Sequence, residues 1–85
     1  MKQPVVTIYG RTGCHLCEDA VNLISPLAKS HDFVLQEKLI DGDSELEDLY
    51  GQLIPVIHIN GKYFSHFRID LIDFKSSLEK HRQHQ

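Results

Sequence analysis

Two cysteines separated by only two residues are the feature that most constrains this chain. Cys14 and Cys17 are its only cysteines. A disulfide between them would close a loop too short to restrict much of the unfolded chain, and domains stapled by disulfides carry more cysteines at wider spacing. Gly13 sets the pair beside a turn, which argues against two buried and inert thiols. We therefore expect the two cysteines to be chemically reactive rather than structural.

The residues around the cysteines predict a strand, a turn and then a helix. Residues 4–9, Pro-Val-Val-Thr-Ile-Tyr, are rich in the β-branched and aromatic side chains typical of a buried strand. Residues 10–13 form a turn, and from Cys14 onward apolar side chains recur at helical spacing. Pro26 is expected to kink or shorten the end of this helix. Cys14 therefore stands where the helix begins.

The middle of the chain predicts a second strand followed by a short helix. Residues 33–40 have strand character. One face of this strand carries Phe33, Leu35 and Leu39. Ser44 and Glu47 match the capping box S-x-x-E, which predicts a helix over residues 45–50. The acidic run over residues 41–48 is interpreted as a solvated loop and helix face.

A hairpin and a final helix complete the predicted fold. Residues 54–59 predict a strand entered through a proline, and Asn60-Gly61 is a strong hairpin signal that joins it to residues 62–65. The last helix is expected to start near Asp70. Its inward face carries Leu71, Phe74 and Leu78. The order β-α-β-α-β-β-α predicts an α/β fold, in which a four-stranded mixed sheet has a right-handed crossover between its parallel strands and helices on both faces.

Composition narrows the class of protein and its compartment. A length of 85 residues suits one folding unit, so we expect residues 1–85 to form a single domain. Nine Lys and Arg against twelve Asp and Glu give a net charge of −3, which argues against a nucleic-acid partner. No apolar run approaches the roughly 20 residues of a membrane span, so no membrane partner is expected. The opening residues MKQPVVTIYG show no apolar signal-peptide region, which favours the cytoplasm.

A strand, a Cys-x-x-Cys motif and a helix in a β-α-β pattern form a thioredoxin-like redox signature. The first turn of a helix presents unpaired N–H groups and a partial positive charge, which lower the pKa of a thiol there below the free value of about 8.5. Cys14 is thus the expected nucleophile, and Cys17, one turn later, is expected to attack a mixed disulfide formed at Cys14. Arg11 would add positive potential, and the charge of His15 would modulate Cys14 near neutral pH.

Three segments carry a resemblance to a known family. Cys14-His15-Leu16-Cys17, Tyr50-Gly51 and Ile54-Pro55-Val56 together resemble the short glutaredoxin-like family of the thioredoxin superfamily, and the likeness runs from about Val5 to Leu78. The resemblance implies a thioredoxin/glutaredoxin-like fold with Cys14 as the attacking thiol and Cys17 as the resolving thiol. It also implies a cis peptide bond between Ile54 and Pro55, which brings the backbone of this loop beside the disulfide.

The stretch after the hairpin departs from the glutathione-binding members of that family. Those members follow the Asn-Gly hairpin with a Gly-Gly-acidic segment, whereas residues 64–70 read Phe-Ser-His-Phe-Arg-Ile-Asp and contain no glycine pair. The same stretch is similar to the F-R-x-D segment of redoxins that reduce ribonucleotide reductase and are recharged by thioredoxin reductase, with Phe64 in place of the usual Trp. The electron donor therefore stays open between glutathione and a thioredoxin-reductase-like protein.

These observations lead to two hypotheses of different classes. In the first, the chain is a glutaredoxin-like thiol–disulfide oxidoreductase that acts on protein or low-molecular-weight disulfides, with no cofactor beyond the redox-active Cys14–Cys17 disulfide. In the second, it is a non-catalytic thioredoxin-fold module that binds a metal or a protein partner, because C-x-x-C is half of a zinc site and six histidines are present. His15 lies between the cysteines on a helix and is poorly placed to join them at one metal, so no metal ligands are assigned.

Three further residues are candidates for contact with a partner or substrate. His66 and Arg68 follow the hairpin, where they would form a docking or anion-contacting patch or, equally well, a solvated connection to the last helix. Tyr9 ends the first strand and is expected to pack under the cysteine loop, with core packing as its plainest role. His58 in the third strand is interpreted as an outward-facing polar position.

Overall fold

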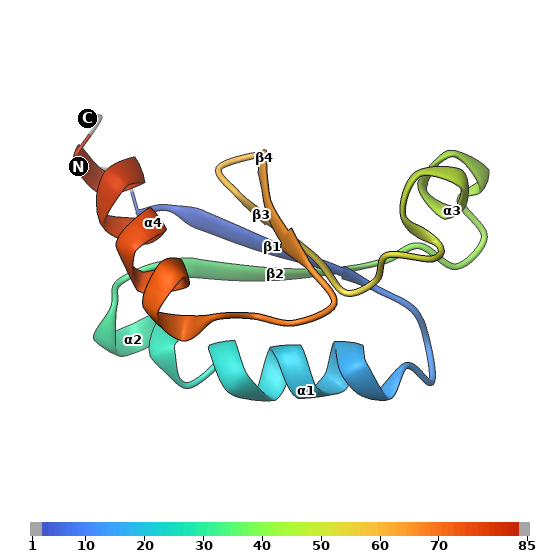
Figure 1. Ribbon diagram of the computed structural model, residues 1–85, viewed down its shortest axis with the longest axis horizontal. Helices are drawn as coiled ribbons and strands as arrows, with labels where there is room; N and C mark the ends of the chain where they lie inside the picture. The colour runs from blue at the N-terminus through green and yellow to red at the C-terminus, as the bar shows by residue number, and fades with distance from the viewer. Residues whose placement is uncertain (1–2, 84–85) are drawn as a thin grey trace.

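Within residues 3–83, which the computed structural model describes, helices and strands follow the predicted order (Figure 1). They are β1 (Val5–Gly10), α1 (His15–Ile24), α2 (Leu27–Ser30), β2 (Val34–Leu39), α3 (Ser44–Tyr50), β3 (Val56–Ile59), β4 (Lys62–His66) and α4 (Leu71–Gln83). The first predicted helix is divided in two, and Pro26 is the N-cap residue of α2. A proline lacks the N–H group that would continue the hydrogen bonds of α1, so the expected shortening is confirmed.

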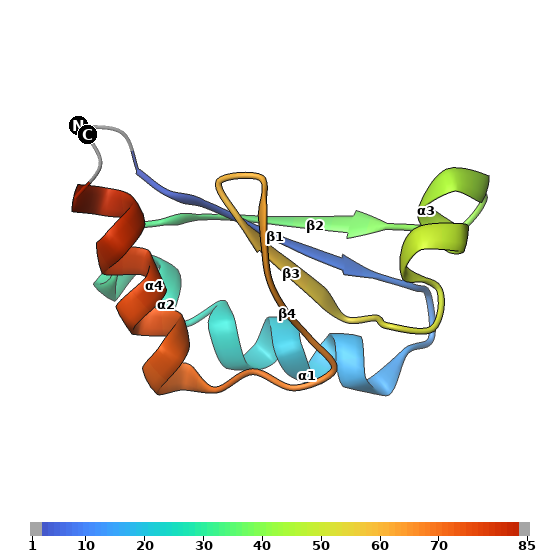
Figure 2. The ribbon, with the colours of Figure 1, turned by 45° about the horizontal axis from the view of Figure 1, so that its top comes forward.

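The strands form one mixed sheet in the order β2-β1-β3-β4. β1 runs parallel to β2 and antiparallel to β3, and β3 runs antiparallel to β4. The β3–β4 turn has φ angles of 52° at Asn60 and 79° at Gly61, and a tight hairpin turn requires positive φ at both positions. The predicted hairpin is therefore confirmed. Figure 2 shows it twisted relative to β1 and β2.

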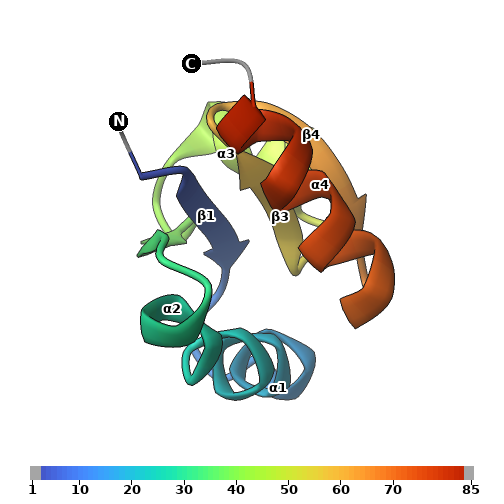
Figure 3. The ribbon, with the colours of Figure 1, turned by 90° about the vertical axis from the view of Figure 1, so that its left-hand side faces the viewer.

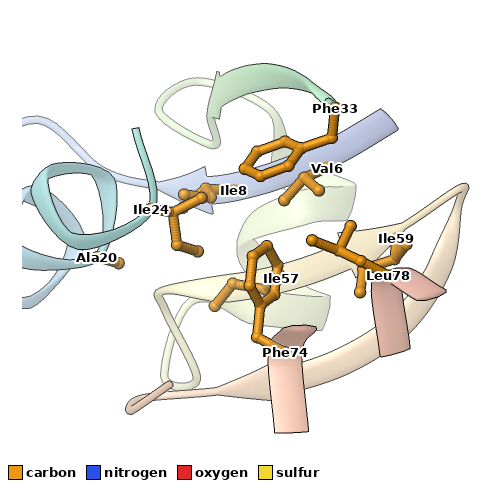
Figure 4. Packing of buried hydrophobic residues seen from close by; sticks show 9 residues of the cluster. All are labelled: Val6, Ile8, Ala20, Ile24, Phe33, Ile57, Ile59, Phe74 and Leu78. Atoms are coloured by element: carbon orange, nitrogen blue, oxygen red, sulfur yellow. The ribbon is translucent and has the colours of Figure 1, made fainter. Parts of the chain in front are cut away.

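α1 and α4 cover one face of the sheet and bury an apolar core there (Figure 3). Alternate residues of β1 and β3 point to this face, and Figure 4 shows their side chains meeting those of the two helices. The buried cluster consists of Val6, Ile8, Ala20, Ile24, Phe33, Ile57, Ile59, Phe74 and Leu78. Phe74 packs edge-on against Phe33 and Phe64, with ring centroids 5.6 and 5.9 Å apart. This face supplies the apolar burial that stabilises the fold.

The opposite face carries polar and aromatic side chains under sparser cover. β1 and β3 turn Thr7, Tyr9 and His58 toward it, and the ring of Tyr50 in α3 contacts those of Tyr9 and His58. Tyr50 Oη and His58 Nε2 form a hydrogen bond of 3.2 Å. In Figure 1 the rest of α3 lies beyond the end of the sheet. Helices therefore lie on both sides of the sheet, as predicted, but they cover the two faces unequally.

Asp43, rather than Ser44, caps α3. Asp43 Oδ1 accepts the backbone N–H of Leu46 at 3.1 Å. Both residue types cap helices well, so the predicted helix is confirmed while the predicted capping box is wrong. Leu39 lies on the same face of β2 as Leu35, as expected, but it is 59% exposed and lines a surface pocket beside α1.

α4 begins where the sequence predicts. Asp70 Oδ1 accepts the backbone N–H groups of Ile72 and Asp73 at 2.9 and 3.2 Å, which satisfies donors that the first helical turn leaves unpaired. Phe74 and Leu78 are fully buried, as predicted. Across residues 3–83, none of the helices is both long enough and apolar enough to cross a membrane.

Candidate active site

Cys14 and Cys17 are joined by a disulfide at the start of α1, with their Cα atoms 5.2 Å apart. Cys14 is the N-cap residue of the helix, and its Sγ accepts the backbone N–H of Cys17 at 3.2 Å. The N-cap is where a helix presents its unpaired N–H groups and its partial positive charge. Cys14 therefore occupies the position at which a helix stabilises a thiolate.

The two sulfur-bearing residues differ in exposure. Cys14 is half-buried, whereas Cys17 is 6% exposed and packs against Gly10 at the end of β1. A Cβ atom at position 10 would lie 3.0 Å from Cys17 Cβ and 3.1 Å from Cys17 Sγ, so a larger residue there would collide with the disulfide. Gly10, expected in a turn, instead ends β1. Its contact with Cys17 could not be predicted, because nothing in the local sequence distinguishes a turn glycine from one that accommodates a distant atom.

The peptide bond between Ile54 and Pro55 is cis, as the family resemblance predicted. The antiparallel register of β1 and β3 brings Pro55 level with Gly10, next to the region of the disulfide. Pro55 is fully buried, and its carbonyl accepts the backbone N–H of Phe67 at 3.0 Å. The proline loop therefore connects the cysteine region with the segment between β4 and α4.

An apolar pocket of about 250 Å³ lies between α1 and that segment. Its lining residues are Leu16, Asp19, Ala20, Leu23, Phe67, Arg68 and Ile69. Leu16, between the cysteines, is 52% exposed, and Phe67 is 46% exposed. Phe67 also has a φ of 64°, a conformation that bulky residues rarely adopt. Exposed apolar side chains and a strained backbone beside a disulfide favour a contact surface for another molecule.

The predicted contact residues differ in how closely they approach the apolar pocket. Arg68 lines the apolar pocket. His66 packs its ring against Tyr63 and Phe67 and forms a hydrogen bond with the hydroxyl of Tyr63. His15 is exposed at the start of α1. Arg68 therefore lines the pocket directly, and His66 adjoins it through the ring of Phe67.

Tyr9 points to the opposite face of β1 from its neighbour Gly10. Its ring centroid lies 5.0 Å from that of Tyr50 and 5.1 Å from that of His58. Tyr9 therefore packs with the residues that anchor α3 rather than under the cysteine loop. His58, interpreted as an outward-facing polar position, is half-buried in the same cluster.

A second pocket, of about 490 Å³, lies on the other flank of α1 and reaches Cys17. Its lining residues are Ile8, Gly10, Arg11, Thr12, Gly13, Cys17, Glu18, Val21, Asn22, Glu37, Lys38 and Leu39. Arg11 forms an ion pair with Glu47 of α3, with nitrogen and oxygen 3.2 Å apart, and Asp41 accepts the backbone N–H of Thr12 at 3.2 Å. The acidic side chains over residues 41–48 are exposed, as predicted, and Asp41 and Glu47 among them also have defined partners.

The arrangement offers a disulfide between a half-buried and a buried cysteine, flanked by an apolar pocket and by a larger pocket that polar and apolar residues line together. Such a disulfide is suited to exchange with a second disulfide or with thiols. In the part of the chain that the structure describes, no three or more His, Cys, Asp or Glu side chains are grouped so that they could hold a metal ion.

Comparison with known proteins agrees with this geometry. Residues 5–79 match the family described as Glutaredoxin-like domain (DUF836). Protein Ne2328 from Nitrosomonas europaea is 30% identical and superposes with a TM-score of 0.80 over 91% of this chain and 93% of its own. The structural-genomics target protein XcR50 from X. campestris is also 30% identical, with a TM-score of 0.70 over 88% of this chain and 96% of its own.

More distant likenesses concern the fold alone. A thioredoxin from Fasciola hepatica is 19% identical and superposes with a TM-score of 0.63 over 93% of this chain and 81% of its own. The family match, by contrast, spans the cysteine pair, the proline loop and most of α4. The chain therefore belongs to the glutaredoxin-like domain family and has a thioredoxin-like fold.

Proposed function

We propose that this chain is a thiol–disulfide oxidoreductase whose Cys14 and Cys17 cycle between dithiol and disulfide. The observation that carries the proposal is the position of Cys14 at the N-cap of α1, with Cys17 protected against Gly10. A helix N-terminus favours the thiolate, which is the nucleophilic form of cysteine. A protected second thiol is suited to resolving a mixed disulfide rather than to starting an exchange.

The reaction begins when the Cys14 thiolate attacks one sulfur of a substrate disulfide. A bond forms between Cys14 Sγ and that sulfur, and the other substrate sulfur leaves as a thiolate. Cys17, as its thiolate, then attacks Cys14 Sγ and releases the second substrate thiolate. Two electrons pass to the substrate, which becomes a dithiol, and the protein keeps the Cys14–Cys17 disulfide. No organic cofactor is needed for this exchange.

The apolar pocket beside Leu16 supports a protein disulfide as the substrate. Leu16, Leu23 and Phe67 are large apolar side chains that face solvent there, and such patches suit contact with another protein. Arg68 adds a positive charge at the same surface. A substrate cysteine flanked by apolar residues would bury this patch while its disulfide meets Cys14.

An external donor must reduce the Cys14–Cys17 disulfide before the next cycle. The donor is glutathione or a reductase of the thioredoxin-reductase type, and residues 64–70 lack the glycine pair typical of glutathione-gripping glutaredoxins. We propose the cytoplasm as the compartment, because the glutathione and thioredoxin systems there keep thiols reduced and supply such electrons. The proposed partners are thus a disulfide substrate and a thiol donor.

Two single-cysteine variants test the proposed roles. Cys14→Ser should abolish reduction of a disulfide-bonded protein substrate, because no nucleophile remains at the helix N-terminus. Cys17→Ser should instead accumulate a stable mixed disulfide at Cys14, because the resolving thiol is missing. Turnover is followed by labelling of substrate thiols, and trapped adducts are located by peptide mass spectrometry.

Two results with the same variants would overturn the proposal. Dithiol turnover that survives Cys14→Ser, or an adduct that maps to a residue other than Cys14, contradicts the assignment of roles. A stoichiometric metal held by both thiols in the purified wild-type protein would instead support the non-catalytic module.

A further inference from the structure

The segment between β1 and Cys14 is held by residues that lie far away in the sequence. The carbonyl of Gly10 accepts the backbone N–H of Ile40 at 2.8 Å, which extends the parallel pairing of β1 and β2 by one step. The backbone N–H of Thr12 donates to Asp41 Oδ1 at 3.2 Å. Both partners belong to the loop between β2 and α3, so this loop fixes the start of the cysteine segment.

Glu47 links the segment before Cys14 to α3 as well. One of its carboxylate oxygens lies 3.2 Å from the guanidinium of Arg11, and the other accepts the backbone N–H of Gly42 at 3.2 Å. The side chains of Arg11 and Glu47 are 39% and 43% exposed, so water screens part of their attraction. Glu47 nevertheless binds both the cysteine segment and the loop that carries Asp41.

The attached segment leads directly to the reactive cysteine. The carbonyl of Arg11 accepts the backbone N–H of Cys14 at 3.2 Å, so a shift of Arg11 would move Cys14 with it. Arg11 also lines the pocket that reaches Cys17, together with the carboxylate-bearing Glu18. Arg11 is therefore joined to Cys14 by a backbone hydrogen bond and lines the same pocket as Cys17.

From these contacts we infer that Asp41 and Glu47 are positioning residues for the cysteine pair: Asp41 fixes the segment before Cys14, and Glu47 offsets the charge of Arg11 and so lowers the stability of the dithiol relative to the disulfide. The inference rests on the proposed exchange function. α3, which covers little of the sheet, then serves to hold and adjust the redox site.

Glutamine variants measure the charge effect with little change in shape. Glu47→Gln leaves the charge of Arg11 uncompensated, which favours the Cys14 thiolate and hence the dithiol. In glutathione buffers we expect the equilibrium constant for reduction of the disulfide to rise about threefold, or about 14 mV at 29.6 mV per tenfold. Arg11→Gln should lower the constant by a similar factor. The double variant Arg11→Gln/Glu47→Gln should return close to the wild-type value.

A matched control separates this contact from a general change in charge. Glu45→Gln removes the same charge from an exposed residue at the start of α3, and it should leave the equilibrium constant within experimental error of wild type. The charge effect of Glu47→Gln should also shrink at high salt, because both members of the pair are partly exposed.

Two substitutions at position 41 separate geometry from charge. Asp41→Asn keeps an oxygen that accepts the N–H of Thr12, whereas Asp41→Ala removes it. We expect hydrogen exchange at the Thr12 amide to stay slow in Asp41→Asn and to become faster in Asp41→Ala. The Asp41→Ala variant should also change the equilibrium constant more than Asp41→Asn does.

Several outcomes would overturn the inference while leaving the proposed function intact. Equal shifts for Glu47→Gln and Glu45→Gln would show that the specific pair is irrelevant. Shifts of the same sign for Arg11→Gln and Glu47→Gln would show that the charges do not oppose each other at Cys14. A wild-type protein with no reversible transition would instead reject the proposed function itself.

Discussion

The two faces of the sheet hold their helices by different means. On one face, α1 and α4 bury aliphatic and aromatic side chains of β1 and β3, and Phe74 and Leu78 are completely enclosed. On the other face, α3 contacts the sheet through the ring and hydroxyl of Tyr50. α3 itself contains no buried residue, and it reaches the cysteine segment through Arg11 and Glu47.

This difference indicates that one face stabilises the fold and the other adjusts the geometry and charge of the cysteine site. Apolar burial is strong and non-directional. We therefore expect the face that α1 and α4 cover to contribute most of the free energy of unfolding. Hydrogen bonds and exposed ion pairs each contribute little net stability but fix geometry and charge. The cysteine pair lies where the two regions meet, since Cys17 packs against Gly10 of the core face while Arg11, before Cys14, pairs with Glu47 of α3.

The largest effect should come from the core face. Phe74→Ala removes a ring that packs against Phe33 and Phe64, and we expect the free energy of unfolding of the oxidised protein to fall by about 3–5 kcal/mol. Ile72→Ala on the same helix, at an 80% exposed position, should change it by less than about 0.5 kcal/mol. Urea titration measures both. Similar losses for the two variants would contradict the placement of the core.

An intermediate effect is expected where the two regions meet. Gly10→Ala introduces a Cβ about 3.0 Å from that of Cys17, and such overpacking should lower the free energy of unfolding by about 1–3 kcal/mol. Cys17→Ala removes the sulfur 3.1 Å from the new Cβ but keeps the Cβ of residue 17, so Gly10→Ala should destabilise this background less, though not become neutral. A double-mutant cycle of the reduced proteins gives the coupling. No coupling between the two positions would exclude the contact between the new Cβ and the sulfur of Cys17.

The smallest effect should come from the second face. Tyr50→Phe removes the hydroxyl that bonds to His58 but keeps the ring, so we expect a loss of about 1 kcal/mol in the free energy of unfolding. Tyr63→Phe, at a 56% exposed position, should cost less because water replaces its hydrogen bond. If Tyr50→Phe destabilised the chain as much as Phe74→Ala, the contrast between the two faces would be wrong.

Features set by neighbouring residues were predictable from the sequence. Cys14 caps a helix because apolar side chains recur at helical spacing after it, and Pro26 divides that helix because it lacks an N–H group. Asn60 and Gly61 both adopt the positive φ that their dipeptide predicts. In each case the physical cause lies within a few residues of the effect.

Features set by distant residues were not predictable. Asp41 and Glu47 follow their partners Thr12 and Arg11 by 29 and 36 positions, and they meet them only because β1 and β2 pair in parallel. The side of the sheet to which Tyr9 points depends on which face α1 covers, and no local pattern specifies that. Asp43 and Ser44 are equally good helix caps, so the choice between them was also open.

A redox titration of the wild-type cysteine pair in glutathione buffers, read by the mass added on thiol alkylation, tests the central claim most directly. We predict a single reversible two-electron transition between Cys14–Cys17 disulfide and dithiol, with a potential inside the range of about −270 to −120 mV spanned by thioredoxin-fold proteins. The absence of a reversible transition, or thiols that become reactive only after a chelator is added, would contradict the assignment of this pair as an exchange site.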